Sequence, residues 1–146
     1  MPVVAPQQLN ARAAARLATH EPSQRCRVLI VDDDELIVCR VASLLERSGY
    51  EVFAARSGED AMRVLNAMTC HIVVTDWQMP DMNGLELCRD IRSRIDKAYI
   101  YVLMLTVRNG SGDILSALSA GADDYAVKGA TAEELLARLE VGRRLI

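Results

Sequence analysis

The stretch from residue 72 to residue 84 reads IVVTDWQMPDMNG and joins an apolar run to an acid and a turn. Ile72, Val73 and Val74 are consecutive β-branched residues, which is typical of a strand that is buried on both faces. Asp76 follows two residues later, and the Pro, Asn and Gly residues beyond it have the composition of a turn. The pattern therefore predicts a buried parallel strand that delivers one carboxylate to a loop.

The same pattern recurs along the chain. Val28–Val31 is a second apolar run, and it ends in three acids, Asp32 to Asp34. Strand patterns occur at 28–31, 51–54 (a weak one), 72–74, 100–105 and 125–127, and helical patterns follow at 36–45, 57–65, 85–91, 113–120 and 131–139. This alternation predicts an α/β fold: a five-stranded parallel sheet with helices on both faces, in the flavodoxin-like (βα)5 doubly wound arrangement.

Length and composition indicate a single folded domain with an extension before it. The chain has 146 residues, of which 51% are hydrophobic and 25% charged, close to the average for globular domains. Residues 1–25 are punctuated by three prolines and hold few large apolar side chains. We therefore expect residues 1–25 to be a flexible or loosely helical N-terminal extension and residues 26–146 to form the domain.

Charge, apolar runs and cysteines indicate which partners and which cellular compartment to expect. The formal net charge of −3 argues against direct nucleic-acid binding, which needs a basic face. The longest apolar run, Ala98–Leu105, is too short to insert across a bilayer, and the N-terminus lacks a secretory apolar segment. The cysteines show no Cys-x-x-Cys pair, so we expect reduced, mostly buried thiols and a cytoplasmic protein; they are Cys26, Cys39, Cys70 and Cys88.

Polar residues follow the predicted strands at the edge where ligands bind in such sheets. Clustered carboxylates repel one another unless a cation joins them, and an oxygen-only site with few protein ligands suits Mg²⁺. An amine and a hydroxyl beside that metal could hold a phosphoryl group, with a carboxylate as the nucleophile. The residues at this edge are Asp32, Asp33, Asp34, Asp76, Thr106 and Lys128. Asp34 is predicted to be a helix N-cap rather than a ligand.

Five blocks of the sequence, in order, resemble the receiver domain of two-component response regulators. The resemblance covers residues 26–146. Its blocks are Val28–Asp33, Val73–Gly84, Leu105-Thr106 and two within Gly121–Lys128, namely the GADDY run and the strand that ends in the lysine. The ending of the chain further resembles receivers that are joined to a diguanylate cyclase output domain.

The resemblance implies a role for each matching residue. Asp76 would accept the phosphoryl group. Asp33, Asp76 and the backbone carbonyl of Gln78 would ligate Mg²⁺ directly, and Asp32 would act through a bound water. The phosphoryl oxygens would be bound by Lys128 and Thr106, and the switch would be formed by Thr106 and Tyr125, the tyrosine moving from an outward to an inward rotamer.

The resemblance also implies partners. The phosphoryl group would come from a histidine kinase or a histidine phosphotransfer protein, and an output domain, a partner protein or a second copy of the chain would read the switch. The chain would then be a phosphoryl acceptor with autodephosphorylation rather than an ordinary enzyme. Nucleic acid and membrane would not be direct partners.

Two positions depart from the family's pattern. Gly129 stands where a proline usually follows the lysine, so we expect a trans Lys128–Gly129 bond and an altered lysine placement. Val107 replaces the usual small residue after the threonine and could narrow access to Asp76. Trp77 is predicted to be a partly exposed neighbour of the site.

Two other functions remain open on the sequence alone. A phosphotransferase or phosphatase of the haloacid-dehalogenase type needs a second aspartate two residues after the nucleophile, and Gln78 occupies that position. A degenerate receiver that is never phosphorylated would serve only for docking. Mg²⁺ binding distinguishes this last reading from a working receiver.

Overall fold

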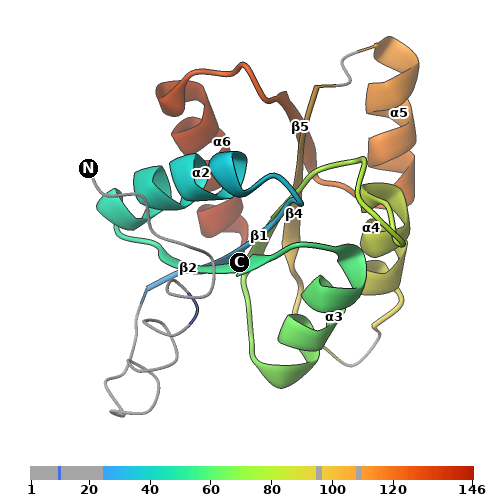
Figure 1. Ribbon diagram of the computed structural model, residues 1–146, viewed down its shortest axis with the longest axis horizontal. Helices are drawn as coiled ribbons and strands as arrows, with labels where there is room; N and C mark the ends of the chain where they lie inside the picture. Colours follow the sequence, from blue (N-terminus) through green and yellow to red (C-terminus); the bar gives the residue numbers. More distant parts are fainter. Residues whose placement is uncertain (1–9, 11–24, 95–96, 108–109) are drawn as a thin grey trace.

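The computed structural model describes residues 10, 25–94, 97–107 and 110–146, which form one parallel sheet packed between helices (Figure 1). The sheet order is β2-β1-β3-β4-β5, and every neighbouring pair is parallel. The strands are β1 (Arg27–Val31), β2 (Glu51–Ala55), β3 (Ile72–Thr75), β4 (Tyr101–Thr106) and β5 (Asp124–Val127). The predicted five-stranded parallel sheet is confirmed.

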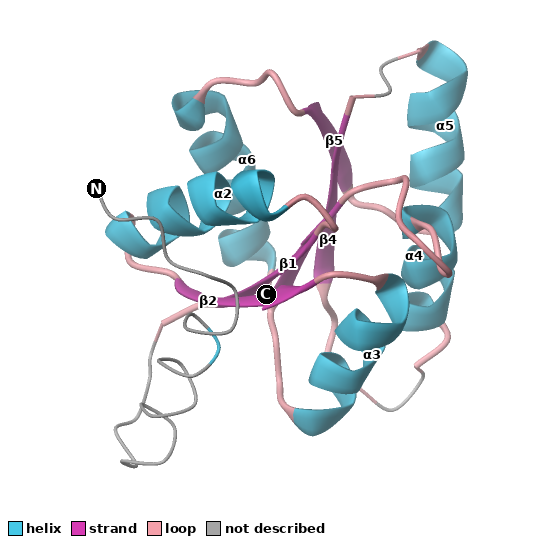
Figure 2. Ribbon diagram, viewed as in Figure 1, coloured by secondary structure: helices cyan, strands magenta, loops and turns pink. Residues whose placement is uncertain are grey.

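The helices lie on both faces of the sheet, as the alternating pattern predicts (Figure 2). One face is covered by α2 (Glu35–Arg47) and α6 (Ala132–Leu145). The other face is covered by α3 (Gly58–Ala67), α4 (Gly84–Arg92) and α5 (Ser111–Ala120). The doubly wound fold class is therefore confirmed.

Two apolar cores lie on the two faces of the sheet because alternate strand residues point in opposite directions. Leu29, Val73 and Val102 pack towards α3, α4 and α5, and their neighbours Val28 and Val74 pack towards α2 and α6. All of these side chains are essentially inaccessible to solvent. The β-branched runs of the sequence are thus strands that are buried on both faces, as expected.

Side-chain caps fix where the helices start, and so where the loops at the carboxyl edge begin. Asp34 accepts a hydrogen bond from the backbone N–H of Leu36 (3.0 Å), which confirms its predicted capping role. Ser57, Asn83 and Thr131 cap α3, α4 and α6 in the same way. Gly121, with φ of 114°, ends α5 in the left-handed conformation that glycine adopts without strain.

The structure corrects the expectation for the second strand and leaves the expected N-terminal extension untested. The second strand is not weak: all five residues of β2 are buried, although it lies at the edge of the sheet. The predicted extension, residues 1–25, lies outside the described residues apart from Asn10 and Arg25, so its character and the boundary at residue 26 stay predictions. Among the helices that are described, none is both long and apolar enough to cross a membrane.

Candidate functional site

The carboxyl ends of three strands bring four charged side chains together. Val31 of β1 is in register with Thr75 of β3, so the acids that follow these two strands lie side by side. Lys128 directly follows β5 and reaches across to the same edge. The structure thus brings together Asp32, Asp33, Asp76 and Lys128, as the fold predicts.

Three carboxylates of this group are placed as a cation site. One oxygen from each of Asp32, Asp33 and Asp76 lies within 4.8 Å of the other two. Asp32 and Asp76 are 3% and 8% exposed, whereas Asp33 faces solvent, which leaves an open side for water. Carboxylate oxygens of this number and partial openness fit Mg²⁺, which keeps several waters when it binds to proteins.

Lys128 bridges the two buried acids. Its Nζ lies 2.8 Å from Oδ2 of Asp32 and 2.9 Å from Oδ2 of Asp76. The backbone N–H of Lys128 donates to the carbonyl of Thr106 (3.0 Å), which ties the lysine to the end of β4. The bond to Gly129 is trans, as expected, and it does not prevent the lysine from reaching Asp76.

Burial and charge shift the protonation equilibria at this edge. Burial raises the pKa of Asp32, and the charge of Asp76 adds to that rise, although hydrogen bonds from Lys128 and from the backbone of Asp34 oppose it. Burial acts to lower the pKa of Lys128, but its bonds to Asp32 and Asp76 outweigh that effect and leave the pKa raised. Burial therefore works against the ionised form of Asp32, whereas the bonds of Lys128 to both acids favour the cationic form of the lysine.

Both carboxylate oxygens of Asp76 accept hydrogen bonds. Oδ2 accepts from Lys128, and Oδ1 accepts from the backbone N–H of Trp77 at 2.7 Å. The Trp77 side chain is 8% exposed and packs in the core beneath α3, α4 and α5, so the expectation of a partly exposed tryptophan is wrong. The backbone of Trp77 is also fixed by the turn that follows, since the Gly84 N–H donates to its carbonyl (2.8 Å).

The predicted switch residues lie beside this cluster. Thr106 ends β4 and is 1% exposed, and Tyr125 of β5 is 8% exposed. Tyr125 is in register with Met104, two residues before Thr106, and packs with the core below α5. The structure holds the tyrosine in a buried position; a movement between two rotamers stays a prediction.

Gln78 and Val107 lie outside the charged cluster. The side chain of Gln78 is exposed in the loop between β3 and α4, and the proposed ligation by its backbone carbonyl stays a prediction. Val107 is 71% exposed, so its side chain extends into solvent at the rim of the site. An effect of Val107 on access to Asp76 stays a prediction.

Sequence reasoning missed the tight approach of α4 to Asp76. A Cβ on Gly84 would lie 2.3 Å from the backbone oxygen of Asp76 and 3.0 Å from Cα of Trp77. Only glycine therefore allows the first turn of α4 to lie against the peptide that carries the acid. A sequence signal was present, because Gly84 stands at the start of a predicted helix, where glycine is a poor helix former and can mark a close backbone contact.

Comparisons with known proteins agree with this arrangement. The family model for the response regulator receiver domain matches residues 28–140. The chain is 37% identical over 117 residues to the chemotaxis protein CheY1 of Helicobacter pylori, covering 79% of this chain and 94% of that protein. It is 36% identical over 114 residues to the alkaline phosphatase synthesis transcriptional regulatory protein PhoP of Bacillus subtilis, covering 78% of this chain.

The chain spans only part of some of these relatives: 47% of PhoP, against 94% of CheY1. Among solved structures, the chemotaxis response regulator CheY4 of Vibrio cholerae superposes with a TM-score of 0.76 at 28% identity, covering 82% of this chain and 99% of that one. The BeF3-activated DrrB receiver domain superposes with a TM-score of 0.74 at 32% identity, covering 83% and 99%.

Proposed function

The chain belongs to the family of response regulator receiver domains, and on that premise we propose that it accepts a phosphoryl group on Asp76 in a Mg²⁺-dependent step. The observation that carries the proposal is the geometry around this residue. Three carboxylates converge within 4.8 Å, and one lysine bridges two of them. An acid that is buried, positioned and paired in this way is suited to phosphoryl transfer, which depends on placement and charge neutralisation.

The transfer replaces one bond to phosphorus by another. A carboxylate oxygen of Asp76 attacks the phosphorus of a phosphohistidine, the new O–P bond forms, and the N–P bond breaks so that the imidazole leaves and takes up a proton. The N–H of Trp77 keeps the carboxylate oriented during the attack. Lys128 then exchanges its bond to Asp76 for a bond to a phosphoryl oxygen, and autodephosphorylation by water returns the acid.

The acidic set would hold the metal. Asp33 and Asp76, with the carbonyl of Gln78, would ligate Mg²⁺ directly, and Asp32 would act through water. The ion would neutralise the carboxylates and the incoming phosphoryl oxygens. Within the described part of the chain, the ion pairs of this cluster come from Lys128, so one positive charge faces three carboxylates there.

Signalling would proceed through β4 and β5. Once the phosphoryl group is in place, the hydroxyl of Thr106 would turn towards it and vacate space behind β4, and Tyr125 would settle into that space. Both side chains are already buried on adjacent strands, with Tyr125 in register two residues before Thr106, which supports this coupling. The face formed by α5, β5 and α6 would carry the change to an output domain, a partner protein or a second copy of the chain.

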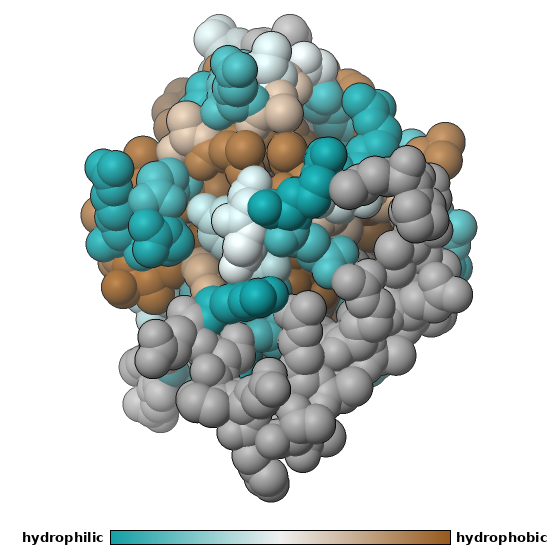
Figure 3. All heavy atoms as spheres, turned by 90° about the vertical axis from the view of Figure 1, so that its left-hand side faces the viewer, coloured by the Kyte–Doolittle hydropathy of each residue, from teal (hydrophilic) through white to brown (hydrophobic). Residues whose placement is uncertain are grey.

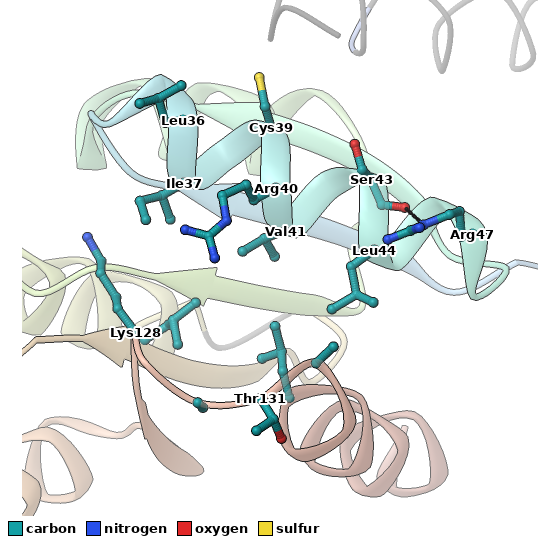
Figure 4. Close-up of a pocket in the computed structure, with 14 residues that line it drawn as sticks. Leu36, Ile37, Cys39, Arg40, Val41, Ser43, Leu44, Arg47, Lys128 and Thr131 are labelled. Atoms are coloured by element: carbon teal, nitrogen blue, oxygen red, sulfur yellow. Dashed lines mark hydrogen bonds between the residues drawn. The ribbon is translucent and has the colours of Figure 1, made fainter. Parts of the chain in front are cut away.

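A phosphodonor protein has a surface to dock on beside Asp76. A groove of about 430 Å³ runs between α2 and the start of α6, and Lys128 lies at one end of it. Ile37, Val41 and Leu44 point into it from α2, with Arg40 among them (Figure 4). Apolar surface also gathers between hydrophilic side chains on this side of the molecule (Figure 3). We assign the groove to a helix of the histidine kinase or phosphotransfer protein.

Leu36 offers a test of that docking surface, because it lines the groove and is 70% exposed. Leu36→Asp should slow transfer from a phosphorylated histidine kinase that labels the wild type by about tenfold, the cost of one misplaced interface charge. Labelling by acetyl phosphate should stay unchanged. Equal transfer from the kinase to both proteins would place the docking surface elsewhere.

The alternatives are less well supported. At the position two residues after Asp76, a haloacid-dehalogenase-type enzyme would place a catalytic acid, and here Gln78 is an exposed amide. A docking module without phosphorylation would have no use for an assembled acidic cluster and its lysine. We therefore propose a cytoplasmic signalling protein that is a phosphoryl acceptor and not an ordinary enzyme, with any enzymatic output in a separate domain.

Intact-mass spectrometry after incubation with acetyl phosphate tests the proposal. The wild type should gain one phosphoryl group only when Mg²⁺ is present, and hydroxylamine should remove it. Asp76→Asn should gain none, whereas Asp81→Asn, in the exposed loop that follows, should behave like the wild type. Labelling of Asp76→Asn to the wild-type extent would refute the assignment of the acceptor.

A further inference from the structure

Asn10 lies outside the residues matched by the family model, and it makes two hydrogen bonds to the sheet. Its Nδ2 donates to the carbonyl of Ala54 (3.0 Å), and its Oδ1 accepts from the N–H of Ala54 (2.8 Å). One side-chain amide thus occupies both backbone groups of one residue, 44 positions away in the sequence.

Ala54 belongs to β2, which lies at one edge of the sheet. Successive peptide groups of a strand point to opposite sides, and the contacts from Glu51 N–H to the Cys26 carbonyl and from Asp32 N–H to the Ala55 carbonyl lie on the β1 side. The N–H and C=O of Ala54 therefore face outwards, where an edge strand normally meets solvent or another chain. Asn10 takes the place of a neighbouring strand at this point.

The burial of β2 agrees with a covered edge. Each of its five residues is at most 3% exposed, and Ala54 itself is 3% exposed. An alanine has little side chain to hide, so this value also means that its backbone is shielded.

The covered end of β2 touches the charged cluster. The carbonyl of Ala55 accepts a hydrogen bond from the N–H of Asp32 (3.1 Å), and Asp32 in turn bonds Lys128 and the N–H of Asp34. The last residues of β2 therefore hold the backbone of one of the acids. Fraying of β2 at Ala54 would loosen this support.

We propose that Asn10 is a positioning residue: it binds the outer edge of β2 at Ala54 and thereby holds Asp32 in place for the cation. The part of this inference that concerns the cation rests on the function proposed above. The part that concerns the edge of β2 does not, since it follows from the contacts of Asn10 alone.

Amide-resolved hydrogen exchange of the metal-free, full-length chain tests the edge contact. Asn10→Ala and the similarly sized apolar Asn10→Leu should each accelerate exchange at the Ala54 amide by about threefold to tenfold, the factor that corresponds to one net hydrogen bond. Asn66→Ala removes an exposed amide from α3 and should leave the Ala54 rate unchanged. An Ala54 amide that exchanges equally fast in the wild type and both Asn10 variants would overturn the proposal.

A Mg²⁺ titration followed by fluorescence of Trp77, the single tryptophan, tests the positioning role. The Kd for Mg²⁺ should rise about twofold to tenfold in both Asn10 variants, the factor that one net hydrogen bond corresponds to, and stay at the wild-type value in Asn66→Ala. Faster hydrogen exchange at the Ala54 amide together with an unchanged Kd for Mg²⁺ would refute positioning of Asp32 by Asn10. If the wild type itself bound no Mg²⁺, the proposed function would fail while the exchange experiment still reported on Asn10.

Discussion

At the scale of single residues, Asp32 carries a charge that the fold accommodates poorly without a cation. Burial raises its pKa above the ordinary value of 3.8, and the charge of Asp76 adds to the effect. A folded protein that binds this proton more tightly than the unfolded chain gains stability from it below pH 3.8. That gain is lost as the pH rises through the folded-state pKa, so at neutral pH the ionised carboxylate is destabilising.

Asp32→Asn should therefore stabilise the metal-free protein at neutral pH by a few degrees in Tm, because the amide removes the buried charge while Lys128 keeps its bond to Asp76. The difference should shrink as the pH falls towards 3.8, because a carboxyl with a raised pKa becomes protonated above that pH. Thermal denaturation in a chelator across this pH range measures it. Asp34→Asn is the control, since Asn caps a helix about as well as Asp and residue 34 is exposed. A lower Tm for Asp32→Asn at pH 7 would contradict this account.

At the scale of elements, the contact between α4 and β3 depends on Gly84. A Cβ there would lie 2.3 Å from the backbone oxygen of Asp76, so Gly84→Ala must shift either α4 or the peptide that carries the acid. We expect a loss of about 2–3 kcal/mol of unfolding free energy, measured by urea denaturation. Gly112→Ala in α5, where a Cβ would meet no atom within 4 Å, should gain about 0.5–1 kcal/mol. Equal effects of the two substitutions would show that the close approach is not rigid.

Arg92, at the end of α4, contacts the two loops that lead into β4 and β5. Its guanidinium donates to the carbonyls of Ile100 (2.7 Å) and Gly121 (2.9 Å) and to the carboxylate of Asp123 (2.7 Å), and it stacks on Tyr99. Arg92→Ala removes the guanidinium from all three acceptors, although Asp123 still accepts from the N–H of Val102 (2.8 Å).

The expected loss for Arg92→Ala is about 2 kcal/mol of unfolding free energy, because an ion pair and two charge-assisted hydrogen bonds to carbonyls disappear together. Arg89→Ala, on an exposed position of the same helix, should change stability by less than about 0.5 kcal/mol. Urea denaturation of both variants gives the comparison. A loss in Arg89→Ala as large as in Arg92→Ala would argue against a specific role for the guanidinium.

The sequence predicted the elements well and their mutual contacts poorly. Apolar runs such as Val28–Val31 can be assigned because a strand buried on both faces leaves a continuous signature, and alternation with helices then places Asp76 and Lys128 at one edge. The burial of Trp77 and the need for glycine at position 84 depend on how the turn after β3 folds back on itself. Such contacts join residues through space and leave no periodic trace in the sequence.

At the scale of the whole molecule, cation binding should be coupled to folding. Three carboxylates that repel one another in the free protein would be joined by Mg²⁺ in the folded state only. At a Mg²⁺ concentration one hundred times the Kd, the free energy of unfolding should therefore rise by about 2.7 kcal/mol. Thermal denaturation with MgCl₂, against NaCl of equal ionic strength, measures the gain.

Asp33→Asn should remove most of that gain because it deletes an exposed ligand of the cluster. In the absence of Mg²⁺ the Tm of the same variant should be close to that of the wild type, since the Asp33 side chain faces solvent. A full Mg²⁺ response in Asp33→Asn would mean that the ion binds elsewhere on the surface.

The central claim is that Asp76 itself becomes the phosphorylated residue. Borohydride reduction converts an aspartyl phosphate into homoserine, and peptide sequencing by tandem mass spectrometry then locates the altered position. After incubation with acetyl phosphate and Mg²⁺, the account predicts homoserine at position 76 and unmodified aspartates at positions 32 and 33. Homoserine at position 32 or 33, with position 76 intact, would contradict it.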